Sequence, residues 1–242
     1  MRSGAGQVQR AGGARLLVHV EGQTEESVVN EILGPHLYRH GYTSVSARLL
    51  GNARQRAQRG GIRSWPTVRK EIINHLKEDT SSLATTMVDY YGMPRTGADA
   101  WPGRDAAGVL PFPQKAVTVQ KAMHLDICNV LGQGFDRRRF IPYVTIHEFE
   151  GLLFSHCVRF AQGIGRPDLT QQFQEIRDGF ESPEEINDSD VTAPSKRVEE
   201  LVPGYEKPFL GTLAALEVGF DAIRVECPNF RQWLEYLEAL PK

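Results

Sequence analysis

The feature that most restricts the fold of this sequence is a regular alternation of short apolar runs and longer amphipathic segments over its first 150 residues. Short runs rich in apolar or β-branched side chains are typical of strands. They cover residues 15–20, 43–50, 82–88 and 140–146. The longer segments place apolar side chains every three or four positions and predict helices. They cover residues 24–37, 65–78 and 117–131. Strands alternating with helices predict an α/β fold with a mostly parallel, Rossmann-like sheet flanked by helices.

The last third of the chain has a different pattern. A helix is expected to begin near His147, and beyond Pro167 the periodicity is mainly helical. The helices are expected near residues 170–178, 195–201, 208–218 and 229–239. We therefore predict a disordered tail over 1–14, an α/β core over 15–160, and a helical C-terminal part over 161–242 that packs on the core.

Composition narrows the class of protein. Hydrophobic residues make up 40% of the chain and charged residues 24%, as in ordinary globular domains. Its apolar runs are far shorter than the roughly 20 residues of a membrane helix, so we expect no membrane association. The three cysteines form no CxxC pair, which disfavours a disulfide framework or a zinc ribbon. We expect a cytoplasmic protein.

The net charge of −2 conceals an uneven distribution of charge. Seven basic residues and no acid lie between Arg48 and Lys70, whereas seven acids and one base lie between Glu175 and Asp190. The basic segment is flanked by glycines and can contact the phosphates of a nucleic acid, DNA or RNA. The alternative is that this basic segment is an ordinary solvated surface loop. The candidate phosphate contacts in this segment are Arg54, Arg56, Arg59 and Arg63.

Carboxylates follow three of the predicted strands. Glu21 and Glu25 follow the first strand, Asp89 the third, and Glu148 and Glu150 the fourth. Ligand sites of parallel sheets lie beyond the carboxyl ends of the strands, and carboxylate oxygens are the ligands that Mg²⁺ or Mn²⁺ prefers. Each acid by itself has a simpler explanation as a cap or turn residue. Their coincidence at three strand ends predicts a metal site.

Zinc is a weaker alternative at the same place. His147 and Glu150 stand in the segment His147–Gly151, which lacks the second histidine of an HExxH site. Oxygen ligands therefore favour a harder ion, and two such ions can activate water for phosphodiester cleavage.

Six separated motifs resemble those of a bacterial Toprim-like family, domain of unknown function 4276, over about residues 15–240. The first resembles the opening motif of Toprim domains, the metal-binding fold shared by topoisomerases, bacterial primases and the overcoming-lysogenization-defect nucleases. The motifs are VEGQTEE (20–26), TTMVDYYGMP (85–94), HEFEGLLFS (147–155), IND (186–188), APSKR (193–197) and YEK (205–207).

The resemblance implies roles for individual residues. Glu21 matches the Toprim glutamate that binds metal, Glu25 matches a second glutamate of the nuclease subgroup, and Asp89 matches the first aspartate of the DxD motif. Glu150, in preference to Glu148, fills the later acidic position. Lys196 resembles a late lysine that stabilises the charged transition state, with assistance from Arg197. A surface pair at the start of a helix is the alternative for these two basic residues.

One position departs from the Toprim pattern. Tyr91 stands where the second aspartate of the DxD motif is expected, and a phenol with a pKa near 10 is a poor magnesium ligand. The second carboxylate is then absent, or Glu148 or Asp99 supplies it. Tyr90 and Tyr91 can stack on a base or pack in the core.

Two functions remain open. The first is an Mg²⁺- or Mn²⁺-dependent nuclease, for which the resemblance implies a phage-defence setting and an ATPase partner of the ABC or AAA type. The second is a non-catalytic module that regulates or docks onto such a partner. Nucleotidyl transfer, as in primases, is disfavoured because the sequence has neither a zinc-binding domain nor an evident nucleotide-binding loop.

Overall fold

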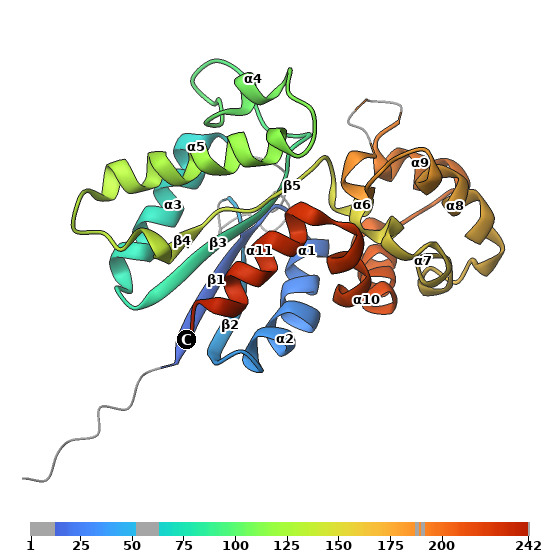
Figure 1. Ribbon diagram of the computed structural model, residues 1–242, viewed down its shortest axis with the longest axis horizontal. Helices are drawn as coiled ribbons and strands as arrows, with labels where there is room; N and C mark the ends of the chain where they lie inside the picture. The colour runs from blue at the N-terminus through green and yellow to red at the C-terminus, as the bar shows by residue number, and fades with distance from the viewer. Residues whose placement is uncertain (1–12, 52–62, 187–188, 190–191, 242) are drawn as a thin grey trace, which may run out of the picture.

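A computed structural model of the chain describes residues 13–51, 63–186, 189 and 192–241, and the following account concerns these residues. Five strands form one sheet in the order β2-β1-β3-β4, with β5 also paired to β3 (Figure 1). All four strand pairings are parallel. The predicted α/β fold with a mostly parallel sheet is confirmed.

The strands agree closely with the apolar runs. Their bounds are Ala14–Val20 (β1), Tyr42–Leu49 (β2), Ser82–Asp89 (β3), Phe140–Ile141 (β4) and Val144–Thr145 (β5). β1 lies between β2 and β3, where its Val18 and Val20 are fully buried. Both faces of such a central parallel strand are covered, which explains its nearly continuous apolar sequence.

The single strand expected over 140–146 is wrong, because the segment forms two short strands, β4 and β5. Pro142 stands between them and has no backbone N–H to donate to a ladder. The side chain of Thr86 in β3 bridges the interruption: its Oγ1 donates to the carbonyl of Tyr143 at 2.8 Å and accepts from the amide of Tyr143 at 3.0 Å. The sheet therefore continues to Thr145, opposite Asp89.

Two apolar clusters cover the two faces of the sheet. On one face lie α3 (Trp65–Glu78) and α5 (Gln114–Leu131), which pack with Ala84 and Val88 of β3. On the other face lie α1 (Gln23–Val28), α2 (Gly34–Tyr38) and the last helix, α11 (Pro228–Ala239). A π-helical segment, η1 (Val29–Leu33), joins α1 to α2, so the helix predicted over 24–37 is present with a bulge inside it. The short α4 (Arg104–Ala107) lies in the Pro- and Gly-rich segment before α5.

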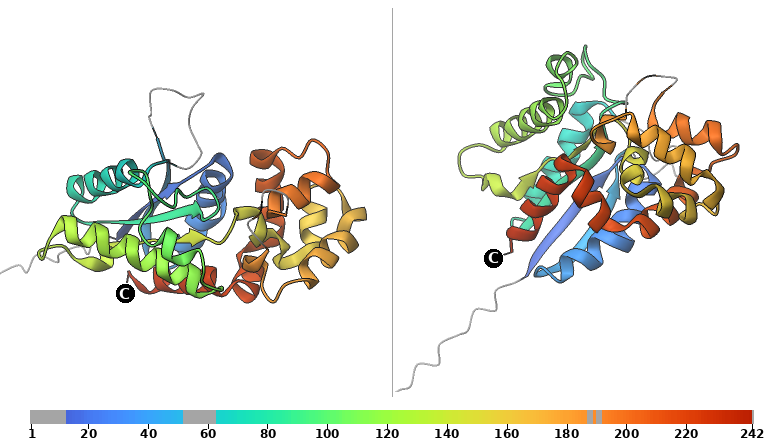
Figure 2. Two further views of the ribbon diagram at one scale, coloured as in Figure 1. Left: turned by 90° about the horizontal axis from the view of Figure 1, so that it is seen from above. Right: turned by 45° about the vertical axis from the view of Figure 1, so that its right-hand side comes forward.

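The remaining helices form a helical lobe beside the sheet, as the two views of Figure 2 show. The lobe contains α6 (Phe149–Leu153), α7 (Cys157–Gly163), α8 (Thr170–Asp178), α9 (Pro194–Leu201) and α10 (Thr212–Glu226). Short helical segments connect them: η4 (Phe154–His156), η5 (Pro167–Leu169), η6 (Pro183–Glu185) and the π-helical η7 (Lys207–Gly211). A further short turn, η3 (Arg137–Arg139), lies outside the lobe and joins α5 to β4. The apolar cluster under α1 and α11 continues into this lobe through residues such as Phe160 and Phe173.

The chain leaves the lobe through α10 and returns to the sheet as α11. Three of the predicted C-terminal helices correspond to α8, α9 and α11, whereas the helix expected over 208–218 begins as η7 and continues as α10 to Glu226. Within the described part of the chain, no helix combines the length and the apolar character needed to cross a membrane.

Candidate metal centre

Glu21 and Asp89 meet at the carboxyl ends of two adjacent strands. Glu21 directly follows β1 and Asp89 is the last residue of β3. The Glu21 carboxylate accepts a hydrogen bond of 3.1 Å from the Asp89 amide. β1 and β3 run parallel with Val20 opposite Met87, so the register itself brings these two residues together. The predicted meeting of the two strand ends is therefore present.

Glu25 comes from the first turn of α1 and is buried, with 6% of its surface exposed. The extended Gly22 precedes this helix. A Cβ atom at position 22 would lie 2.8 Å from Glu25 Oε2, so a larger residue there would displace the carboxylate from its place over the turn. The same turn thus holds Glu21 at the end of β1 and Glu25 behind it.

Glu148 and Glu150 come from the start of α6, just beyond β5, and both are buried. The carboxylate of Glu148 accepts a hydrogen bond of 2.8 Å from the amide of Ser195, at the N-terminus of α9. Because β5 pairs with β3 beside Asp89, this turn delivers its acids to the same sheet edge. Next to them, Nδ1 of His147 lies 2.7 Å from the carbonyl of Ile186.

Lys207 is the residue of this site that the sequence analysis missed. Its ammonium lies 3.2 Å from Glu150 Oε2 and 3.9 Å from Glu148 Oε1. η7 carries this lysine and packs on α1. Gly211 permits this close packing, because a Cβ atom at position 211 would lie only 3.2 Å from Thr24 Cγ2. The YEK motif at 205–207 was an available signal for it.

The five acids share one electrostatic environment. Burial and the neighbouring carboxylates Glu21, Glu25 and Glu150 raise the pKa of Asp89 well above its usual value. Burial, Glu150 and Glu21 likewise raise the pKa of Glu25, to about 8. Burial raises the pKa of Glu21 and of Glu150, in both cases with a further contribution from Glu148. This crowding of buried negative charge is what a bound cation would relieve.

Lys207 supplies part of the missing positive charge. Burial opposes its protonation, but Glu150, Glu148 and Asp89 outweigh that effect and raise the pKa of Lys207. The ammonium therefore stays charged at neutral pH and balances one of the surrounding carboxylates.

The donor set fits a hard divalent ion. Asp89 Oδ1 is buried and accepts no hydrogen bond, which leaves one carboxylate oxygen of the group without a partner. Carboxylate oxygens are the ligands that Mg²⁺ and Mn²⁺ prefer. Among the described residues, no three of these acids bring oxygen atoms within 4.8 Å of one another, so the side chains would draw closer around an ion. A cavity of about 630 Å³ lies elsewhere, lined by residues such as Cys157, Gln174 and Arg177.

The other predicted site residues lie apart from this group or outside the described residues. Lys196 is exposed on α9 and forms a 2.7 Å ion pair with Glu199 of the same helix. Arg197 is half-buried, donates to the carbonyl of Thr192 and covers the ring of Phe180. Arg63 is half-buried beside Gly51. Arg54, Arg56 and Arg59 lie outside the described residues, as do residues 1–12 of the predicted tail.

Tyr90 and Tyr91, for which base stacking and core packing were the two alternatives, lie in different environments. Tyr90 is fully buried, and Arg104 lies over its ring at 3.7 Å and donates to its hydroxyl at 2.9 Å. Core packing therefore accounts for Tyr90, whereas Tyr91 is half-exposed. Asp99 is exposed, and its carbonyl accepts from the amide of Trp65.

This architecture defines an α/β protein in which three adjacent parallel strands lead into one group of buried and half-buried carboxylates. The family model described as "Domain of unknown function (DUF4276)" matches residues 20–238, and the chain belongs to this family, as its motifs predicted. No curated protein matches the chain. Among solved structures, the C-terminal region of the OLD protein of Xanthomonas campestris pv. campestris is similar, with 16% identity and a TM-score of 0.39. That similarity covers 93% of this chain and 94% of the other.

Proposed function

We propose that this protein is a divalent-metal-dependent nuclease of the Toprim type that hydrolyses phosphodiester bonds in DNA or RNA. The observation that carries the proposal is the convergence of Glu21, Asp89 and Glu150 from three adjacent strand ends, with one unpartnered oxygen on Asp89. Mg²⁺ or Mn²⁺ is the proposed cofactor. When bound, such an ion supplies Lewis-acid activation of water and of the phosphate.

The chain's own residues take separate roles in this proposal. Glu21, Asp89 and Glu150 would hold the ion, and Glu148, oriented by the Ser195 amide, would complete the oxygen set. Burial and the neighbouring Glu150 raise the pKa of Glu25 to about 8, which brings its titration near neutral pH, the range in which a general acid or base works.

Two lysines are candidates for stabilising the charge that develops on the phosphate. Lys207 contacts the acids directly, whereas Lys196 is placed on the outer surface of α9. A fixed ammonium beside the reacting phosphate stabilises negative charge in the transition state. The contact geometry favours Lys207 for this role.

The setting of the reaction is proposed from the motif resemblance. We place the protein in the cytoplasm as the effector of a bacterial anti-phage defence system, with an ATPase of the ABC or AAA type gating cleavage. Arg54, Arg56, Arg59, Arg63 and Arg197 are the proposed contacts to the nucleic-acid backbone. Contacts of this kind weaken as salt concentration rises.

The test is cleavage of supercoiled plasmid and of labelled single-stranded DNA and RNA, with Mg²⁺, Mn²⁺ or EDTA. We expect metal-dependent products from the wild type and none from Glu21→Gln, which loses a ligand charge but keeps its shape. Glu206→Gln is the matched control, because Glu206 is exposed beside Lys207 in sequence. Undiminished cleavage by Glu21→Gln would refute the assignment.

A different result would favour the non-catalytic alternative. Tyr91 in place of a second aspartate motivates that alternative. In that result, the wild type binds Mg²⁺ tightly and Glu21→Gln does not, but no nucleic acid is cleaved even in the presence of the partner ATPase. The protein would then be a metal-binding regulatory subunit.

A further inference from the structure

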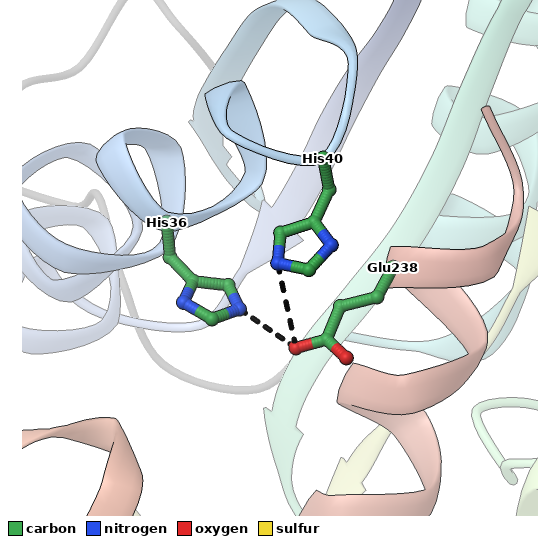
Figure 3. A group of neighbouring side chains, drawn as sticks. All are labelled: His36, His40 and Glu238. Carbon is green, nitrogen blue, oxygen red and sulfur yellow. Dashed lines mark hydrogen bonds and ion pairs between the residues drawn. The ribbon is translucent and has the colours of Figure 1, made fainter. Parts of the chain in front are cut away.

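A second group of potential ligands lies between α2 and α11, near the start of β2, whereas the acids described above lie at the carboxyl ends of the strands. His36 belongs to α2, His40 lies one turn later, and Glu238 belongs to the last turn of α11 (Figure 3). Among the described residues, this is the group of three in which one ligand atom from each side chain lies within 4.8 Å of the other two.

The three side chains already converge on one point. Nε2 of His36 lies 2.8 Å and Nε2 of His40 lies 3.9 Å from the same oxygen, Glu238 Oε1 (Figure 3). The two imidazole rings stack with centroids 4.9 Å apart and planes inclined by 28°. The rings lie close together because His40 stands in the turn that directly follows α2, where its amide donates to the carbonyl of Leu37 at 2.9 Å.

The neighbours of the group hold its members in place. Phe220 packs edge-on against the ring of His36. Arg224 donates to Glu238 Oε1 at 2.8 Å and to Oε2 at 3.1 Å, and it also pairs with Glu235. The two bonds from Arg224 fix the plane of the Glu238 carboxylate, as hydrogen-bonded partners commonly do in metal sites, and an ion would occupy the position on Oε1 that His36 now holds. Because Arg224 pairs with Glu235 as well as with Glu238, only part of its positive charge opposes a cation bound at Glu238.

We propose that His36, His40 and Glu238 form a binding site for a borderline transition-metal ion, of which Zn²⁺ is the representative, that ties α2 to α11. Two imidazoles and one carboxylate are a common donor set for zinc and a poor one for Mg²⁺. The ion would take the place of the hydrogen bond from His36 to Glu238. His40 is 33% exposed, so water can reach the remaining coordination position.

This site would have a structural consequence distinct from cleavage. α2 belongs to the N-terminal part of the chain and α11 to its C-terminus, so the ion would close a connection between residues about 200 positions apart. Binding only to the folded state stabilises that state by mass action. The readout is therefore binding and stability, which are independent of nuclease activity.

The experiment is calorimetric titration of ZnCl₂ into protein that has been stripped of metal and of any histidine tag. We expect one zinc equivalent that is lost in the double variant His36→Asn/His40→Asn and weakened at least tenfold in Glu238→Gln. At zinc concentrations about a hundredfold above Kd, Tm of the wild type should rise by roughly 5–10 °C. Excess Mg²⁺ should not displace this zinc.

Two control variants separate this site from other causes. His156→Asn should bind zinc like the wild type, because His156 lies outside the group and asparagine can keep its acceptor role at the start of α7. Glu21→Gln should keep the histidine-dependent equivalent, which separates it from any zinc at the strand-end acids. If the double variant is unfolded by circular dichroism, the single variant His40→Asn replaces it. Absence of zinc binding, or an equal stoichiometry with and without the histidines, overturns the proposal.

Discussion

At the scale of single residues, Lys207 controls the charge balance of the strand-end acids. It is the cation seen within 4 Å of Glu148 and Glu150 among the described residues. In the proposed nuclease, its ammonium would compete with the metal ion for the same carboxylates and would also stabilise charge on the phosphate. The first effect lowers metal affinity and the second raises the cleavage rate. Replacing this one residue can therefore separate them, because affinity should rise while the rate falls.

Lys207→Gln is expected to bind Mg²⁺ about tenfold more tightly and to cleave about 10²-fold more slowly than the wild type. Removing one charge at about 4 Å changes the interaction by about 1–4 kcal/mol at effective dielectric constants of 80 to 20, and loss of one electrostatic contact to the transition state typically costs 10²–10³ in rate. Calorimetry with Mg²⁺ and single-turnover cleavage measure the two quantities.

The comparison variants sharpen this prediction. Glu150→Gln should lose both metal affinity and rate, because it removes a ligand instead of a competitor. Lys196→Gln should change neither, since Lys196 pairs with Glu199 on the surface of α9. If Lys196→Gln lost as much cleavage rate as Lys207→Gln, the role of stabilising the transition state would belong to Lys196 as well, the lysine that the sequence motif indicates.

The acids and the lysine of this site differ in how far the sequence could locate them. Glu21 and Asp89 follow strands whose parallel pairing dictates where their side chains meet, so periodicity and strand ends sufficed to group them. Lys207 reaches the site through the packing of η7 on α1, which connects residues almost 190 positions apart. No local pattern encodes that contact, and the motif resemblance indicates a different lysine, Lys196.

At the scale of elements, α10 contains a break that periodicity does not show. Gly219 has φ 74° and ψ 156° inside this helix, a conformation that is almost exclusive to glycine. The break turns the helix between its contacts with α7 and its approach to α11. Pro142 has a comparable effect in the sheet, where it divides a continuous apolar run into β4 and β5. Side-chain periodicity located both elements, whereas the backbone chemistry of one residue set their internal shape.

Gly219→Ala is expected to destabilise the protein by about 1–3 kcal/mol. The cause is conformational and not steric, because no atom lies within 4 Å of a Cβ built at this position. Gly179→Ala is the matched control: Gly179 has φ −75°, and its Cβ would meet only the carbonyl of Ile176 at 3.4 Å. Chemical denaturation should show a clear loss for the first variant and a change near zero for the second. Equal effects would contradict the role assigned to the break.

At the scale of the whole molecule, Glu184 connects the helical lobe to the sheet. It is fully buried in η6, and its carboxylate accepts from the amides of Asn229 and Phe230 at the start of α11, at 2.9 and 3.1 Å. Asn229 in turn donates its side-chain amide to the carbonyl of Val144 in β5. One carboxyl group thus joins the lobe, the returning helix and the strand that leads to the candidate metal centre.

Burial raises the pKa of Glu184 from 4.5 to about 7, against the lowering effect of the hydrogen bonds from Asn229 and Phe230. The folded protein therefore holds a proton that the unfolded chain releases between these two pKa values. The resulting stabilisation is fully present below about pH 4.5 and is lost as pH rises through 7. The difference between the two pKa values corresponds to about 3 kcal/mol.

The test compares the pH dependence of unfolding free energy in the wild type and in Glu184→Gln, which is neutral at every pH and keeps an acceptor oxygen. Between pH 5 and 8 the wild type should lose about 2–3 kcal/mol more than the variant, so that the variant gains relative stability in alkaline solution. Glu181→Gln, at an exposed position in the same segment, should follow the wild-type curve. Parallel curves for wild type and Glu184→Gln would mean that Glu184 keeps its charge in the folded state, held by the two amides of α11. The lobe would then be joined to the sheet by an anion at the helix N-terminus and not by a protonated acid.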